Sequence, residues 1–394
     1  MKKQLFFISM VILLQAVALL ASPTISNAQQ FAAGGDHSLA VCTGSAVWAW
    51  GRNDFGQLGN GSNTHSNIPV QVSSLTGITN IAAGFWHSLA LDNDSTVWAW
   101  GRNEYGQLGN ATDTNSNVPI QVNGLTGITA IADGADFSLA LKNDGKVWAW
   151  GRNVNGFTGS NVPIEMSFLA DIIAISGGRF HSLALKNDGT VWAWGVNDNG
   201  QLGDGTNNTS YVAVQVSFLT GIIAIEAGSL HSIALKNDGT VWTWGENDNG
   251  ELGNGTTFES NVPVQVSSLT SVIAIAGGNG HSLAIRNDGT VWGWGENYFG
   301  ELGNGNNYQS NFPVQASFLT GISAISAGGT HSLGLKNDGT IWSWGSNIEG
   351  ELGNGTYINS NVPVQVTALC RLQLHVTPLS LYCPMQQCYI ITGH

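Results

Sequence analysis

Apolar and polar residues alternate along this chain in short blocks that return at a regular interval. In one block, residues 222–227, 231–235, 241–244 and 262–266 form apolar runs bounded by Gly, Asn, Asp or Pro and rich in β-branched or aromatic side chains. Runs of this length and composition predict β-strands. Outside the first 28 residues, no segment keeps the 3.6-residue period of an amphipathic helix.

The block occurs seven times. Each copy contains a Trp-x-Trp-Gly, with a spacing of 50 residues between copies except for one step of 44. The first tryptophans are Trp48, Trp98, Trp148, Trp192, Trp242, Trp292 and Trp342. Six copies carry a His-Ser pair ahead of it, at His37, His87, His181, His231, His281 and His331, and the third has Phe137 instead of His. A fixed period in this range predicts a repeat architecture.

Alternation within the strands predicts how the units stack. Both tryptophans of Trp-x-Trp point one way, with a small residue between them, while His-Ser-Leu-Ala-Leu puts His and Leu on one face and Ser and Ala on the other. We therefore expect each blade to carry large side chains on one face and small side chains on the other, with neither face exposed to water. Units packed on both faces close into a ring. The sequence predicts an all-β fold, a seven-bladed β-propeller of four-stranded antiparallel blades.

Turn residues support these strand positions. Asn187-Asp188-Gly189 supplies side chains that tolerate positive φ between two strands. Pro263 is expected to open a fourth strand, where its missing N–H does least harm.

The full unit resembles the repeat of the regulator of chromosome condensation family, whose members are seven-bladed propellers. The matching pattern is Gly-x-x-His-Ser-Leu-Ala-Leu, then Asn-Asp-Gly-Thr-Val-Trp-x-Trp-Gly-x-Asn-x-x-Gly-x-Leu-Gly-Asn-Gly, seen here from Gly228 to Gly255. The match covers about residues 31–370. WD-type repeats are shorter and end in Trp-Asp, and Kelch repeats lack His-Ser-Leu-Ala-Leu and Gly-x-Leu-Gly.

Departures from that family limit what the resemblance implies. The third unit lacks six residues in its long loop and has lost Gln-Leu-Gly. The eukaryotic nuclear members act on a small GTPase and on chromatin through an insertion and a basic tail. This chain has neither feature and is acidic, so we do not expect exchange-factor activity. The resemblance points instead to secreted bacterial propellers of this family, at least one of which inhibits an enzyme by capping it with a propeller face.

The two ends of the sequence differ from the repeats. Lys2 and Lys3, an apolar run from about Leu5 to Ala21, and the small residues of Ser26-Asn27-Ala28 predict a signal peptide over 1–28. An uncleaved membrane anchor is the alternative, and the run is short for that role. We therefore expect the protein to be secreted, either extracellular or periplasmic, with a propeller over 29–370 and an irregular tail over 371–394.

Four cysteines are present, and only Cys42 lies within the repeats. A Cys42–Cys370 disulfide would join the two ends of the ring. Cys383 and Cys388 lack the pair spacing of a zinc site. The Asn-Asp-Gly and Gly-Asn-Gly loops lack the 12-residue spacing and closing Glu of a calcium loop. We expect no bound metal and no cofactor.

The repeated His and Ser residues raise the question of catalysis. A Ser-His pair needs a third orienting group and a special environment to act as a nucleophile. Six identical pairs do not make one active site, and buried polar groups are normally hydrogen-bonded to neighbours. We interpret them as structural and expect no catalytic residues and no enzyme activity.

The differences between units point to a binding face instead. In a meander, the turn between the first and second strands and the loop between the third and fourth strands emerge on the same side. These loops vary and carry aromatic and arginine residues, the types that anchor interfaces. The other side carries near-invariant Asn-Asp-Gly-Thr and Leu-Thr-Gly turns. The candidate binding residues are Phe55, Phe85, Trp86, Tyr105, Arg179, Phe180, Tyr298 and Phe299.

Charge narrows the class of partner. The net charge of −13, with only 10 % charged residues, gives no electrostatic footprint for nucleic acid or anionic lipid. We expect a monomeric scaffold that binds a protein or glycan through the variable loops, with no stable membrane span after signal cleavage. A structural or adhesive surface repeat is the alternative, and a regulator of guanine-nucleotide exchange is a further one.

Overall fold

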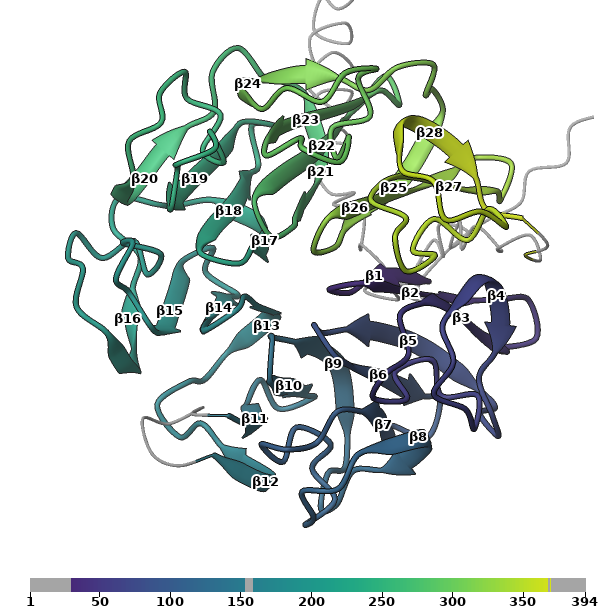
Figure 1. Cartoon of the computed structure of the whole chain (residues 1–394). Coiled ribbons are helices and arrows are strands. Elements are labelled where there is room, and N and C mark those ends of the chain that lie inside the picture. The colour runs from purple at the N-terminus through teal and green to yellow at the C-terminus, as the bar shows by residue number, and fades with distance from the viewer. Residues whose placement is uncertain (1–29, 153–158, 368, 370–394) are drawn as a thin grey trace, which may run out of the picture. The chain divides into compact units, whose positions relative to one another are not determined.

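The computed structural model describes residues 30–152, 159–367 and 369. All of them belong to one compact unit, Ala28–Leu374. The predicted signal peptide and the tail lie outside the described residues. Figure 1 shows the described part as a ring of seven blades, which confirms the predicted seven-bladed β-propeller.

Every blade is one four-stranded antiparallel sheet formed by four consecutive strands. The innermost strands, which line the central channel, are β1 (Phe31–Ala33), β5 (Ile78–Ala83), β9 (Ile128–Asp133), β13 (Ile172–Gly177), β17 (Ile222–Ala227), β21 (Val272–Gly277) and β25 (Ile322–Ala327). The second strands, which carry the His-Ser pairs, are β2 (His37–Val41), β6 (His87–Asp92), β10 (Phe137–Lys142), β14 (His181–Lys186), β18 (His231–Lys236), β22 (His281–Arg286) and β26 (His331–Lys336).

The outer half of each blade holds the tryptophans and the edge. The third strands are β3 (Val47–Gly51), β7 (Val97–Gly101), β11 (Val147–Gly151), β15 (Val191–Gly195), β19 (Val241–Gly245), β23 (Val291–Gly295) and β27 (Ile341–Gly345). The outermost strands are β4 (Ser66–Gln71), β8 (Ser116–Gln121), β12 (Ser160–Glu165), β16 (Ser210–Gln215), β20 (Ser260–Gln265), β24 (Ser310–Gln315) and β28 (Ser360–Gln365).

The prediction that each blade has one bulky and one small face is wrong at the level of the whole sheet. In the first blade Trp50 pairs with Ser38, and Ala49 pairs with Leu39. Directly paired residues share a face, so each face combines a bulky side chain from one strand with a small one from its neighbour. The tryptophan face of one blade packs on the Leu face of the preceding blade, as Trp100 does on Leu39.

The outermost strand also differs from the prediction. Pro263 lies inside β20 and does not open it. The pairing of β19 with β20 shifts register between Thr243 and Gly245, opposite the segment that holds Pro263. A proline without an N–H is tolerated at such a bulge on an edge strand. The Asn-Asp-Gly turn is confirmed, because Gly189 has a φ of 79°.

The ring closes through the same contacts that join other blades. No strand is exchanged between the first and last blades, among the described residues. Ala33 N donates to Ser326 Oγ at 3.0 Å, and Gly329 N donates to Gly34 O at 2.9 Å. Cys42 is disulfide-bonded, and the other three cysteines lie outside the described residues.

Candidate binding face

The repeated histidines form a hydrogen-bonded ring between the blades. Each His Nε2 lies 2.8–2.9 Å from the Ser Oγ of the following blade. His331 of the last blade contacts Ser38 of the first in this way, at 2.8 Å. The structural interpretation of these residues is confirmed, and the partner of each His is a Ser from the same repeated motif.

The bonding pattern assigns the proton on these rings. Ser282 Oγ donates to Glu251 O at 3.1 Å, so His231 Nε2, 2.9 Å away, must donate to Ser282 Oγ. Burial lowers the pKa of His231 to about 4, so the ring is neutral at pH 7. Burial, with smaller contributions from neighbouring histidines at some positions, lowers the pKa values of His37, His181, His281 and His331 to about 3.

One site combines His, Ser and Asp. His87 Nε2 lies 2.9 Å from Ser138 Oγ and 3.1 Å from Asp133 Oδ1. In a nucleophilic triad the carboxylate holds Nδ1 and leaves Nε2 for the serine. Here both contacts are to Nε2, and His87 Nδ1 has no partner among the described residues. The His87 and Asp133 side chains are also buried, so this arrangement lacks both the geometry and the access of a catalytic site.

The variable loops meet on one face of the ring, here called the loop face. Arg52, which follows β3, lies with Nη1 3.3 Å from Oδ2 of Asp36, which precedes β2. Arg52 N also donates to Asp36 O at 2.8 Å. The turn between the first and second strands therefore emerges beside the loop between the third and fourth strands, as predicted.

Arginine and aromatic side chains form a continuous ladder across the loop face of the first four blades. Three repeat-equivalent arginines each lie over an aromatic ring: Arg52 over Trp86 at 4.4 Å, Arg102 over Phe55 at 5.3 Å and Tyr105 at 5.4 Å, and Arg152 over Tyr105 at 4.7 Å and Phe180 at 5.6 Å. Arg179 lies over Phe180 at 5.1 Å and ends the series. We call this set the arginine–aromatic ladder.

Edge-to-face ring contacts and carboxylates fix the ladder. Phe55 and Phe85 both pack edge-on against Trp86, with centroid distances of 5.7 and 6.1 Å. Asp136 lies between two blades, 3.4 Å from Arg102 Nη1 and 3.3 Å from Arg152 Nη1. Arg102 also contacts Glu104. Contacts of this kind order long side chains before any partner arrives, which lowers the entropy cost of binding.

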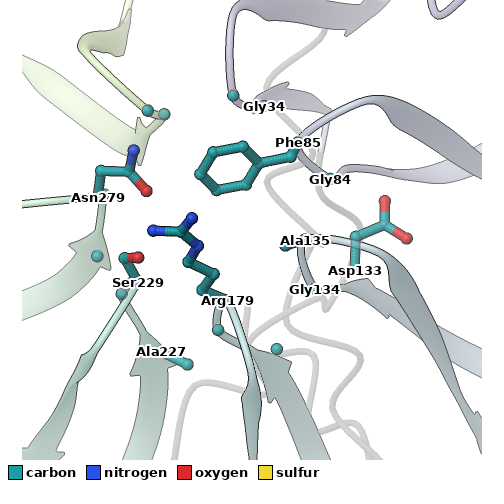
Figure 2. Close-up of a pocket in the computed structure, with 18 of the residues that line it drawn as sticks. Gly34, Gly84, Phe85, Asp133, Gly134, Ala135, Arg179, Ala227, Ser229 and Asn279 are labelled. Atoms are coloured by element: carbon teal, nitrogen blue, oxygen red, sulfur yellow. The ribbon is translucent and has the colours of Figure 1, made fainter. Parts of the chain in front are cut away.

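Six of the eight candidate residues belong to this ladder or contact it. Phe85 and Arg179 also line the mouth of the central channel, and Figure 2 shows both side chains projecting into it from different blades. Tyr298 and Phe299 lie in the sixth blade, and among the described residues none of the ring or cation–π contacts joins them to the ladder. The candidate set is thus one connected group with a separate aromatic pair.

The charge of the loop face changes sign around the ring. The residue directly after Trp-x-Trp-Gly is, in blade order, Arg52, Arg102, Arg152, Val196, Glu246, Glu296 and Ser346. Burial, reinforced by Glu251, Asp248 and Glu296, raises the pKa of Glu246 to about 7. From the sequence, Arg52, Arg102 and Arg152 are expected on this variable face, although only Arg179 of the arginines is among the eight candidate residues. The structure shows that these three arginines join the candidate aromatic residues into one ladder.

The opposite face holds an unexpected feature. Phe218 and Phe318 lie in the connections between blades and are 94 % and 93 % exposed. Both have positive φ, 59° and 57°, which is uncommon for a bulky residue. The expectation that this face is nearly uniform is therefore incomplete.

The described residues hold no group of three or more His, Cys, Asp or Glu side chains that could bind a metal ion. In the Asn-Asp-Gly-Thr turns the Asp carboxylate accepts hydrogen bonds from the turn itself, as Asp188 does from Thr190 N at 2.9 Å. No helix in the described part of the chain is long and apolar enough to cross a membrane.

Seven blades of consecutive strands, joined by a His–Ser ring, define a repeat β-propeller with a variable loop face. The chain belongs to the RCC1-like family. A model of the RCC1-like domain matches residues 158–389, more than half of the chain. Models of the regulator of chromosome condensation (RCC1) repeat match residues 45–91 and 94–141, and also 28–57, 78–107 and 128–156.

Solved structures share this fold. Prp20p from Saccharomyces cerevisiae is 24% identical, with a TM-score of 0.73 over 81% of this chain and 85% of that one. Human WBSCR16 is 24% identical, with a TM-score of 0.74 over 82% and 94%. Yeast RCC1 (Prp20) bound to Kap60 is 23% identical, with a TM-score of 0.73 over 81% and 83%. At these identities the similarity shows the fold alone. No curated protein sequence matches the chain.

Proposed function

We propose that this chain is a secreted scaffold that binds a protein through the arginine–aromatic ladder of its loop face and carries out no catalysis. The observation that carries the proposal is the restriction of the ladder to the first four blades. A feature needed to build the ring would recur around it, as the His–Ser contacts do at six of the seven interfaces.

The chemistry of the ladder suits a protein partner better than a glycan. The few residues that carry most of the binding energy in protein interfaces are enriched in tryptophan, tyrosine and arginine. Trp86, Phe55 and Phe180 are half-buried, and Tyr105 is exposed, so each ring offers part of its surface to a partner. A glycan remains an outcome of the experiment below.

Similar folds bind proteins. The Saccharomyces cerevisiae structure is described together with its binding to Gsp1p and histones, and yeast RCC1 was solved in complex with Kap60. This supports protein binding as a use of the fold. It does not transfer those partners here, because the identity is below 25%.

Binding without catalysis is supported by the state of the repeated His and Ser residues. They are buried and use Nε2 and Oγ in contacts between blades. Secretion is supported by the sequence of the first 28 residues alone, which lie outside the described residues.

The test is capture of binding proteins from the native extracellular medium, with the full chain as bait and quantified proteins as readout. We expect Trp86→Ala and Tyr105→Ala to lower recovery of a saturable partner at least tenfold, since truncating a central aromatic anchor costs about 2 kcal/mol or more. Glycan release before capture separates a protein from a glycan partner.

Matched controls lie on the opposite face. Phe218→Ala and Phe318→Ala remove more exposed aromatic side chains without touching the ladder, and should leave capture unchanged. Loss of capture in these variants alone would place binding on the opposite face and refute the proposal. Capture that no single variant alters would favour a structural or adhesive repeat.

A further inference from the structure

The turns that join the first and second strands of the blades meet at the mouth of the central channel, on the loop face. Each turn contains a glycine, and the residue after that glycine lines the mouth. In blade order these residues are Gly35, Phe85, Ala135, Arg179, Ser229, Asn279 and Gly329. The three polar ones come from consecutive blades, the fourth to the sixth, so the mouth has one polar side.

The glycines bring neighbouring turns into direct contact. A Cβ on Gly178 would lie 2.5 Å from Gly228 O, so a larger residue would force the two turns apart. Backbone hydrogen bonds then join consecutive turns: Arg179 N donates to Ser229 O at 3.0 Å, and Ser229 N donates to Gly278 O at 3.1 Å. The backbones that carry the polar side chains are therefore fixed relative to one another before any ligand arrives, which lowers the entropy cost of binding.

Arg179 differs from the other arginines of the ladder in its charge balance. Arg52, Arg102 and Arg152 each contact one or two carboxylates, whereas Arg179 forms no ion pair with any described residue. All 26 Asp and Glu residues of the chain lie in the described part, so the chain has no further acidic side chain to offer it. The planar guanidinium, with five N–H donors, is well matched to a carboxylate.

The side chains at the mouth converge on one hollow. Figure 2 shows the guanidinium of Arg179 reaching into the mouth, with Ser229 and Asn279 on one side of it and Phe85 on the other. Ser229 is buried and Asn279 is half-buried, and a hydroxyl and an amide can both donate hydrogen bonds. The hollow thus combines three donor groups with one aromatic wall at the centre of the loop face, and residues near the centre of an interface carry most of its binding energy.

The size of the hollow limits what can enter it. Its volume is about 70 Å³. A single water molecule needs about 10–15 Å³, and pockets for small molecules measure about 300–1,000 Å³. The hollow therefore has room for the end of one side chain of a larger partner, and it is too small for a free nucleotide or sugar.

The acidic groups near the mouth leave Arg179 available. Asp133 also lines the mouth, but Figure 2 shows its carboxylate turned away from Arg179, and Asp133 Oδ1 lies 3.1 Å from His87 Nε2. Burial and neighbouring carboxylates raise the pKa of Glu246 to about 7, and the opposing effect of Arg179 is smaller than each of theirs. The net charge of −13 disfavours a polyanion. A single carboxylate is the anion that suits this site.

We propose that the channel mouth receives the carboxylate of an Asp or Glu side chain of the protein that binds to the ladder. The carboxylate accepts hydrogen bonds from Arg179, Ser229 Oγ and Asn279 Nδ2, and its methylene groups pack against Phe85. The proposal rests on the proposed function, because Arg179 is the last member of the ladder and Phe85 packs against Trp86. It adds the chemistry of one partner residue to that surface.

The probe is N-acetyl-glutamate α-amide, which carries one carboxylate on an uncharged backbone, and its matched control is N-acetyl-glutamine α-amide. Each is titrated at pH 7 into the full chain labelled with ¹⁵N, and the arginine Nε–H and backbone N–H signals are followed. The Arg179 signal is assigned by its absence from Arg179→Lys. We expect the glutamate probe to shift the Arg179 and Ser229 signals saturably, with a dissociation constant in the millimolar range, and the glutamine probe to shift neither.

Protein variants test the geometry, with the Ser229 backbone signal as the readout. Arg179→Ala should weaken binding of the glutamate probe at least tenfold, the effect of losing hydrogen bonds to a charged group. Arg179→Lys keeps the charge without the planar fork and should lose less, and Asn279→Ala should weaken binding roughly fivefold. Arg286→Ala is the matched control, because Arg286 Nε donates to Thr270 O on the opposite face, and it should leave the affinity unchanged. Unfolding midpoints close to that of the unaltered chain show that the variants are folded.

Competition links the mouth to the partner. In the capture experiment, a saturating concentration of the glutamate probe should lower recovery of the partner, and the glutamine probe should not. Unchanged recovery would overturn the assignment of the mouth to a side chain of that partner.

The proposal is also overturned if the glutamate probe gives no saturable shift, if the glutamine probe binds equally well, or if Arg179→Ala leaves the affinity unchanged. These results leave the ladder experiment intact, because Trp86 and Tyr105 do not line the mouth. Loss of capture in Trp86→Ala without probe binding would retain the ladder and refute the carboxylate site. Probe binding with no effect of Trp86→Ala on capture would refute the ladder and retain the carboxylate site.

Discussion

Replacing His231 with Phe should destabilise the protein at pH 7 and stabilise it at pH 5. The third blade shows that Phe fits this position, because Phe137 occupies it and is buried. The aromatic side chain has room at both positions, because each packs against a glycine three residues earlier, Gly228 for His231 and Gly134 for Phe137. The substitution removes one titrating group and one hydrogen bond while preserving the packed ring.

At pH 7 the variant should be less stable by about 1 kcal/mol. The bond from His231 Nε2 to Ser282 Oγ, 2.9 Å long, is lost. Ser282 keeps its donation to Glu251 O at 3.1 Å, so its hydroxyl proton is not left without an acceptor. A net contribution of about 1 kcal/mol is usual for one hydrogen bond.

At pH 5 the order should reverse. Burial lowers the pKa of folded His231 to about 4, while an unfolded histidine titrates near 6.5. Between these values the unfolded chain binds a proton that the folded chain does not, so stability falls as the pH falls. This costs the unaltered chain about 2 kcal/mol between pH 7 and pH 5. The Phe variant avoids that loss and should be the more stable by about 1 kcal/mol.

The assay is urea unfolding of both proteins at pH 7, 6 and 5, followed by tryptophan fluorescence. Other titrating groups are common to both proteins, so the difference between them isolates His231. Ser282→Ala is the control: it removes the bond from His231 Nε2 together with the donation to Glu251 O, but keeps the imidazole, and should retain the pH slope of the unaltered chain. If the difference in unfolding free energy between the Phe variant and the unaltered chain is the same from pH 7 to pH 5, His231 is not held neutral by burial and the reasoning fails.

Two further predictions concern the packing of the blades. Gly124→Ala should lower the free energy of unfolding by about 1 kcal/mol, because Gly124 has a φ of 74° but open space around it. Gly253→Ala should cost about 1–3 kcal/mol more, because its Cβ would lie 2.8 Å from Trp294 Cδ1. Equal shifts in the denaturation midpoints of the two variants would contradict this. Glu301→Gln should stabilise the protein above pH 7 by roughly 1–3 kcal/mol, because burial raises the pKa of Glu301 to about 7 and its ionised form opposes folding as the pH rises from 4.5 through 7. Gln fits this position, because in the first blade Gln57 accepts from the equivalent backbone N–H, that of Phe55, at 3.0 Å. The gain in stability should vanish near pH 4, where Glu301 is protonated in both the folded and the unfolded chain, and a gain independent of pH would refute the prediction.

Much of the ring could be predicted from local patterns. The His-Ser pair and Trp-x-Trp-Gly recur with the strand period, so their burial and structural role follow from the sequence. The packing of whole blade faces does not follow, because it depends on which residues pair across strands. Ser38 opposite Trp50 shows that bulky and small side chains share a face.

The arginine–aromatic ladder was harder to predict from the sequence. Arg52, Arg102 and Arg152 stand at one repeat position, but the sequence cannot show that each reaches aromatic rings across an interface between blades. Phe137 and the lost Gln-Leu-Gly are both visible as departures of the third unit.

The sequence by itself determined the number of blades, the position of their strands and the residues that repeat, because these depend on short-range periodicity and turn chemistry. Only the tertiary structure decided that the ring closes without exchanging a strand and that arginines and aromatics alternate along one side of it. Those features depend on contacts between residues about 30 to 50 positions apart, such as Ser138 with Gln107 and Arg52 with Trp86, or at opposite ends of the ring, such as His331 with Ser38. Whether such residues come into contact depends on how the sheets twist and pack, and no local sequence pattern encodes it.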